Sequence, residues 1–144
     1  MGQIKVVAQR SLDAPVDRVL DLIGDYDGTR GGLWPANVTD YRVIAGGKGA
    51  GTRIGYRLHA TKKRIRDVSA EVTAPDASSL VEADQNSTLR TAWRVRSTDT
   101  GSHVTVTTTW AGASGVGGFF ERIFAPIGVR KLWTAVLENL SARL

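Results

Sequence analysis

The chain has 144 residues, a length typical of one domain with its own hydrophobic core. It contains no cysteine and only two histidines, which excludes disulfides, thiolate metal sites and cysteine nucleophiles and argues against a multi-histidine metal centre. The formal net charge is +5. No signal-peptide core or apolar run long enough to span a bilayer occurs, so we expect a soluble cytoplasmic protein without a membrane span. We also expect no metal and no cofactor.

The first elements are a strand and a short helix. Residues 3–12, QIKVVAQRSL, are apolar and β-branched enough for a strand, and the following Asp13, Ala14 and Pro15 are typical of a helix start. Apolar residues then recur at helical spacing, at Val16, Val19, Leu20 and Ile23. Glycines and a proline in residues 26–38 favour a loop or a broken helix there.

The glycine-rich stretch VIAGGKGAGTRIGY, residues 43–56, has some features of a phosphate-binding loop. A phosphate loop needs Gly-Lys followed by Ser or Thr, but Lys48 is followed by Gly49, and Thr52 comes too late. Nucleotide motifs also place a helix after the loop, whereas strand-like alternation flanks this stretch on both sides. The glycines therefore predict a hairpin between two strands and no nucleotide site.

From there to about Trp110 the sequence alternates with a period of two. The inward phase holds Ile54, Tyr56, Leu58, Leu89, Thr91, Trp93, Val95, Val104, Val106, Thr108 and Trp110. Turn residues separate the runs, as in APDASS, DQNS and TDTGS. This pattern predicts an antiparallel sheet covered on one face.

The helical period returns in the last part of the chain. A broad apolar stripe comprises Val116, Phe119, Phe120, Ile123, Phe124, Leu132, Trp133, Val136, Leu137 and Leu140. Pro126 interrupts the stripe, so the helix should kink or restart near Ala125. We expect an α+β fold in which the sheet curves around this long closing helix, with a ligand-sized space between them.

Several segments, in this order, resemble the START-like or Bet v 1-like superfamily, and within it the polyketide cyclase/dehydrase-type branch of the SRPBCC group. They are LDAPVDRVLDLIGDYD, LWPANVTDYRVI, GKGAGTRIGYRL, TAWRVRSTDTGSHVTVTTTW and FERIFAPIGVRKLWTAVLENLSARL. The likeness covers essentially the whole chain, with one departure at Leu20, where many relatives carry an aromatic residue.

The resemblance implies one domain, residues 1–144, with a helix-grip fold. About seven strands would wrap on the C-terminal helix, with short helices after the first strand and a hydrophobic cavity inside. The family includes aromatase/cyclases, lipid and hormone carriers, ribosome-associated toxins and many proteins without an assigned activity. Fold alone therefore does not give the chemistry.

The inward bulky residues are the candidate lining of that cavity. They are Trp34, Tyr56, Leu58, Trp93, Val95, Thr108, Trp110, Phe119, Phe120, Phe124 and Trp133. Each one alone is better explained as ordinary core, but the set favours a flat or lipidic ligand. Both histidines, His59 and His103, are expected to be exposed.

Candidate catalytic residues are Tyr56, Arg64 and Arg66. The two arginines share the phase of the inward valines and would bind a carboxylate or an enolate, unless a bulge or the strand end places them in water. No general base emerges, because the acids near the expected pocket mouth are of the kind that is normally solvated.

Three functions remain open. The first is a carrier or receptor that binds a small hydrophobic or aromatic ligand, polyketide- or lipid-like, as a monomer or homodimer. The second is a polyketide aromatase/cyclase or dehydratase. The third is an RNA-, ribosome- or protein-binding module, with no DNA expected, that uses a basic outer sheet face; its candidate residues are Arg53, Arg57, Arg90, Arg94 and Arg96. Arginines paired with the sheet's own acids would instead be structural.

Overall fold

The structure is a computed structural model, and it describes residues 3–59, 65–111 and 126–144. Three elements open the chain: β1 (Gln3–Leu12), α1 (Val16–Ile23) and the short 3-10 helix η1 (Thr29–Leu33). Six strands follow: β2 (Val38–Ala45), β3 (Arg53–His59), β4 (Ile65–Thr73), β5 (Ser79–Asp84), β6 (Arg90–Thr98) and β7 (Gly101–Ala111). The helix α3 (Pro126–Ser141) closes the described chain.

The seven strands form one sheet in the order β1-β7-β6-β5-β4-β3-β2, and every neighbouring pair is antiparallel. Only the pairing of the first and last strands joins segments far apart in sequence. The predicted alternation is present in β7, where every second residue from Ser102 to Trp110 is buried. The α+β helix-grip architecture expected from the sequence is confirmed.

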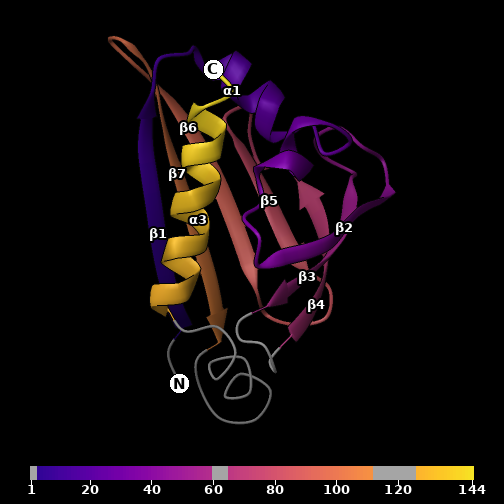
Figure 1. Cartoon of the computed structure of the whole chain (residues 1–144). Helices are drawn as coiled ribbons and strands as arrows, with labels where there is room; N and C mark the ends of the chain where they lie inside the picture. Colours follow the sequence, from indigo (N-terminus) through magenta and orange to yellow (C-terminus); the bar gives the residue numbers. More distant parts are fainter. Residues whose placement is uncertain (1–2, 60–64, 112–125) are drawn as a thin grey trace.

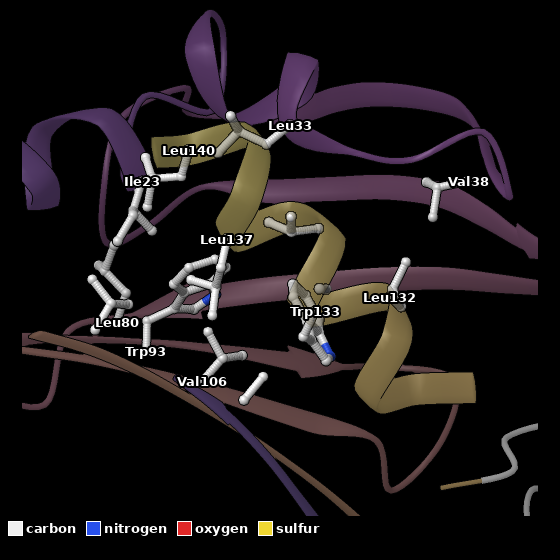
Figure 2. Packing of buried hydrophobic residues seen from close by; sticks show 14 of the residues in the cluster. Ile23, Leu33, Val38, Leu80, Trp93, Val106, Leu132, Trp133, Leu137 and Leu140 are labelled. Carbon is white, nitrogen blue, oxygen red and sulfur yellow. The ribbon is translucent and has the colours of Figure 1, made fainter. Parts of the chain in front are cut away.

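The helix α3 lies along one face of the sheet, where Figure 1 shows it in yellow in front of β1, β7 and β6. The described part of this helix runs from Pro126 to Ser141. Its buried residues recur every three or four positions: Val129, Leu132, Trp133, Val136, Leu137 and Leu140. They pack on the inward side chains of the sheet (Figure 2). Within the described ranges, no helix is long and apolar enough to cross a bilayer.

The glycine-rich stretch is the connection between β2 and β3, as the hairpin prediction requires. Gly47 has a φ of +151°, and a Cβ there would collide with the Asp27 carboxylate. The hairpin backbone is bonded to the segment after α1, because Gly49 N–H donates to the carbonyl of Gly24 and Asp27 N–H donates to that of Gly47. The glycines thus let the hairpin dock against the segment that leads into η1.

Candidate functional site

Three tryptophans meet in the interior between α3 and the sheet. Trp34 follows η1, Trp93 lies on β6 and Trp133 lies on α3. The Trp133 ring centroid is 5.4 Å from that of Trp34 and 5.5 Å from that of Trp93, and the latter pair meets edge to face. We call Trp34, Trp93 and Trp133 the indole cluster. Tyr56 on β3 extends it, with its ring 4.6 Å from that of Trp34.

The indole cluster surrounds a charged side chain that the sequence analysis did not single out. Arg30, on η1, has no exposed surface. Its guanidinium carbon lies 4.3 Å from the Trp34 ring centroid, 5.2 Å from that of Trp93 and 5.7 Å from that of Trp133. Cation–π attraction of this kind strengthens when the cation is removed from water. The aromatic rings therefore compensate part of the cost of burying Arg30.

A buried carboxylate supplies the counter-charge. Arg30 Nη2 donates to both oxygens of Glu82 on β5, at 3.2 and 3.3 Å. The Tyr26 hydroxyl donates to Glu82 Oε2 at 2.7 Å. Glu82 and Tyr26 are also buried, at 4% and 0% exposure. Removing one partner of such a pair leaves an uncompensated charge in the interior, at a typical cost of about 3–5 kcal/mol.

The protonation states follow from this arrangement. Burial by itself lowers the pKa of Arg30, but the Glu82 carboxylate acts the other way, and the net result is a pKa above the ordinary value. Burial, with Glu82 alongside, raises the pKa of Tyr26. Burial likewise raises the pKa of Tyr56. The guanidinium therefore stays charged and both phenols stay neutral at physiological pH.

The segment that carries Arg30 inward is held by backbone and side-chain bonds. Asp25 accepts from Thr29 N–H at 3.1 Å and from Lys48 Nζ at 2.5 Å, which joins the start of η1 to the glycine hairpin. At the other end of η1, Asn139 Nδ2 of α3 donates to the Leu33 carbonyl at 2.9 Å. The position of Arg30 thus depends on both the hairpin and α3.

A small cavity lies beside the indole cluster. Its lining comes from the sheet and α3: Tyr56, Leu58, Leu89, Thr91, Thr108, Val129, Leu132 and Trp133. Its volume is about 10 Å³, space for about one water molecule. The hydroxyls of Thr91 and Thr108 are hydrogen-bonded to each other at 3.0 Å, so the strands present little free polarity there. A larger molecule would have to displace side chains at this place.

Larger hollows lie on the outer surface around α1. One, of about 580 Å³, lies where the start of α1 meets the loops after β4 and β6, and another, of about 390 Å³, lies between α1 and the glycine hairpin. Neither is lined by an aromatic residue. Both are wide open to solvent, and ligand sites typically bury most of the ligand's surface. The interior site fits a hydrophobic molecule better.

The structure brings together some of the residues expected to line a cavity and separates others. Trp34, Tyr56, Trp93 and Trp133 are in ring contact, and Tyr56, Leu58, Thr108 and Trp133 line the small cavity. Val95 and Trp110 are buried in the same core but do not line that cavity. Phe119, Phe120, Phe124 and Arg64 lie outside the described residues.

Arg66 is half-buried and opposite Leu58 in the strand pairing, which places it in the inward phase at the start of β4. Its Nη2 donates to the backbone carbonyl of Asn86 at 3.2 Å. The guanidinium is therefore held at the loop between β5 and β6, and it is not among the groups around the small cavity.

Sequence reasoning missed Arg30, Glu82 and Tyr26. Arg30 and Tyr26 lie in the glycine-rich segment, where no period shows which side chains point inward. Glu82 does carry a signal, since it shares the phase of Leu80 in a strand, but its neighbour Val81 is also apolar and buried. Alternation therefore could not decide which face of β5 is the inner one.

Most of the predicted outward arginines pair with nearby acids. Arg53 lies 3.5 Å from Glu71, and Arg94 lies 3.1 Å from Asp76. Arg57 contacts Asp67 at 3.1 Å and Asp40 at 3.4 Å. These three arginines have structural partners on the sheet or its loops, which weakens the argument for a basic binding platform.

The histidines and acids of the described residues form no further reactive group. His59 bonds Thr39, and His103 bonds Ser11 and Gln9, all near the surface. Within residues 3–59, 65–111 and 126–144, no group of three or more His, Asp or Glu side chains could hold a metal ion. The indole cluster with Arg30 and Glu82 is thus the most unusual chemical feature that the structure describes.

Comparisons with known proteins agree with this architecture. Residues 3–144 match the family described as polyketide cyclase / dehydrase and lipid transport. The solution structure of KanY protein is 43% identical, with a TM-score of 0.89 over 99% of this chain and 98% of that one. No curated protein matches the chain.

More distant structures share the fold. Major latex-like protein 151 of Panax ginseng is 14% identical with a TM-score of 0.73, over 98% of this chain and 97% of that one. The protein TTHA0849 of Thermus thermophilus is 20% identical with a TM-score of 0.67, over 97% of this chain and 96% of that one. At these identities the similarity concerns the helix-grip architecture alone.

Proposed function

Because the chain belongs to the polyketide cyclase / dehydrase and lipid transport family, we propose that it binds a small hydrophobic or aromatic molecule, polyketide- or lipid-like, between the curved sheet and α3. The observation that carries the proposal is the indole cluster with Tyr56, which lies beside the small cavity. Four large rings in one interior region supply flat apolar surface and edge-to-face contacts for an aromatic ligand.

Among the described residues, the space beside the indole cluster has to enlarge before a ligand of this size can occupy it. The described residues leave about 10 Å³ beside Trp133, far less than the several hundred cubic ångströms typical of ligand pockets. Trp34 is the only half-buried member of the indole cluster, so it is the ring through which solvent reaches the cluster. The ligand would take the place of side-chain contacts made by Trp34 and Trp133.

The test is a fluorescence titration with N-phenyl-1-naphthylamine, an uncharged probe that brightens in apolar sites. We expect saturable binding with one probe per chain, accompanied by quenching of tryptophan emission, because three of the four tryptophans belong to the indole cluster. Native mass spectrometry of the purified protein provides a second readout, a bound small molecule. The proposal fails if the probe does not bind and no co-purified molecule is found.

A catalytic role, as an aromatase/cyclase or dehydratase, is the second candidate. The family description includes cyclases and dehydrases, and a buried arginine can stabilise an enolate oxygen. Cyclisation of a reactive chain can rest largely on shape and orientation, so it does not depend on a general base, for which the sequence analysis found no candidate. Incubation with a synthetic poly-β-ketone thioester, followed by mass spectrometry, should show accelerated loss of water if this role is correct.

A further inference from the structure

The buried polar atoms around Arg30 that have no hydrogen-bond partner are of one kind. Among the described residues of this site, they are Arg30 Nε and Nη1 and the indole Nε1 atoms of Trp34, Trp93 and Trp133. All of them are N–H donors, because guanidinium and indole groups have no acceptor. The nearby Glu82 carboxylate, a buried acceptor, already receives bonds from Arg30 and Tyr26. A ligand that completes this site has to bring acceptor oxygens.

The charges of the site are already balanced. One guanidinium faces one carboxylate, and both side chains are almost completely shielded from water, at 0% and 3% exposure. A ligand carboxylate would add a second negative charge that no described cation in the site balances, and the hydrogen bonds that it could accept there would not offset the loss of its hydration. A carbonyl or ether oxygen accepts from Arg30 without that penalty. Because the charges of the site are already balanced, we expect it to bind an uncharged ligand more tightly than a charged one.

Contacts between aromatic rings connect the small cavity with Arg30. Tyr56 and Trp133 line the cavity, and both are in ring contact with Trp34. The Arg30 guanidinium stacks nearest to that same Trp34 ring, at 4.3 Å. A flat molecule that enters at the cavity and displaces the Trp34 ring would thus meet Arg30 Nε and Nη1 at the end of its path.

We propose that Arg30 is the residue that recognises the ligand's polar group, and that the ligand is a flat, uncharged molecule with a carbonyl-type acceptor oxygen. A fatty acid or another carboxylate is a poor ligand by the same argument. This inference rests on the proposed function, because it concerns the same interior site. Arg30 was not among the sequence-based catalytic candidates, which were Tyr56, Arg64 and Arg66.

Three naphthalenes of similar size test the proposal with the full-length protein: 2-acetylnaphthalene, 2-isopropylnaphthalene and 2-naphthoate. Each competes with N-phenyl-1-naphthylamine, in wild type and in the double variant Arg30→Met/Glu82→Gln, which removes both charges together. The affinity for 2-acetylnaphthalene divided by that for 2-isopropylnaphthalene should be about tenfold higher in wild type than in the double variant. A factor of this size is expected from one hydrogen bond between a charged donor and the acetyl oxygen. The single variant Glu82→Gln, which leaves Arg30 without its carboxylate, should raise 2-naphthoate affinity about tenfold.

A second measurement needs only the wild type, in case the variants do not fold. The Arg30 Nε–H resonance in a ¹⁵N-correlated NMR spectrum should shift with 2-acetylnaphthalene and stay in place with 2-isopropylnaphthalene. If the naphthalenes bind but the Arg30 resonance does not respond to the acetyl group, or if 2-naphthoate binds best to wild type, this inference is wrong and the proposed function stands. If none of the three displaces the probe and the probe itself does not bind, the proposed function fails as well.

Discussion

Arg30 and Glu82 are the residues whose burial most needs an explanation. Each would be unstable in the interior alone. Together they are stabilised by the hydrogen bonds from Arg30 Nη2 and the Tyr26 hydroxyl to Glu82 and by the indole rings around the guanidinium, while Arg30 Nε and Nη1 have no hydrogen-bond partner. Replacing an ion pair of this kind with uncharged groups is often tolerated, whereas removing one member is not. The pair is therefore better explained by ligand recognition or by specificity of the fold than by stability.

This argument predicts a non-additive response to substitution. Arg30→Met should lower the free energy of unfolding by about 3–5 kcal/mol, because Glu82 is left buried without its cation. The double variant Arg30→Met/Glu82→Gln should recover more than half of that loss, since no unpaired charge remains. Urea unfolding followed by tryptophan fluorescence measures both values. Equal destabilisation by the single and the double variant would show that the pair is not coupled.

At the scale of elements, η1 depends on its neighbours rather than on its own sequence. It is only five residues long, and three of them are Gly31, Gly32 and Thr29, which are poor helix formers. Asp25, Lys48 and Asn139 hold its two ends. Because these tertiary bonds shape the segment, residues 26–38 show no helical periodicity, and the sequence predicts only a loop or a broken helix there. The periodicity of α1 and of the strands, by contrast, predicts those elements.

The bond between Asp25 and Lys48 predicts a pH dependence. The Lys48 ammonium, together with the Thr29 N–H, lowers the pKa of Asp25 below its usual 3.8 in the folded state. The stabilisation is then fully present above the unfolded-state pKa and is lost as the pH falls through the lower folded-state value. Asp25→Asn should therefore destabilise the protein at pH 7 and have little effect near pH 2. The same effect at both pH values would contradict the role of the carboxylate charge.

For the molecule as a whole, much of the fold could be predicted from the sequence, because a sheet covered on one face requires apolar residues at every second position of its strands. The alternation through Trp93, Val106 and Trp110 corresponds directly to β6 and β7, and the helical spacing from Leu132 to Leu140 corresponds to α3. The inward position of some aromatic residues, such as Tyr56 and Trp93, could be predicted for the same reason. The charged centre of the site was not, because Arg30 reaches the interior from an irregular segment whose path depends on long-range contacts.

The space between the sheet and α3 can be closed by substitution. Leu132→Trp, on the α3 face that lines the small cavity, should weaken binding of N-phenyl-1-naphthylamine by about tenfold or more, because the added ring occupies the ligand's place. Ile127→Trp is the matched control, since it adds a ring to the same helix at a side chain that is 74% exposed. If both variants bind the probe equally well, the ligand does not sit beneath α3.

The most direct measurement of the central claim is the response of the four tryptophan indole N–H signals in a ¹⁵N-correlated NMR spectrum as N-phenyl-1-naphthylamine is added. A ligand between the sheet and α3 predicts that the signals of Trp34, Trp93 and Trp133 shift together and saturate at one equivalent. Unchanged signals for these three, with shifts confined to the outward residues of β7 or to the hollows around α1, would contradict it.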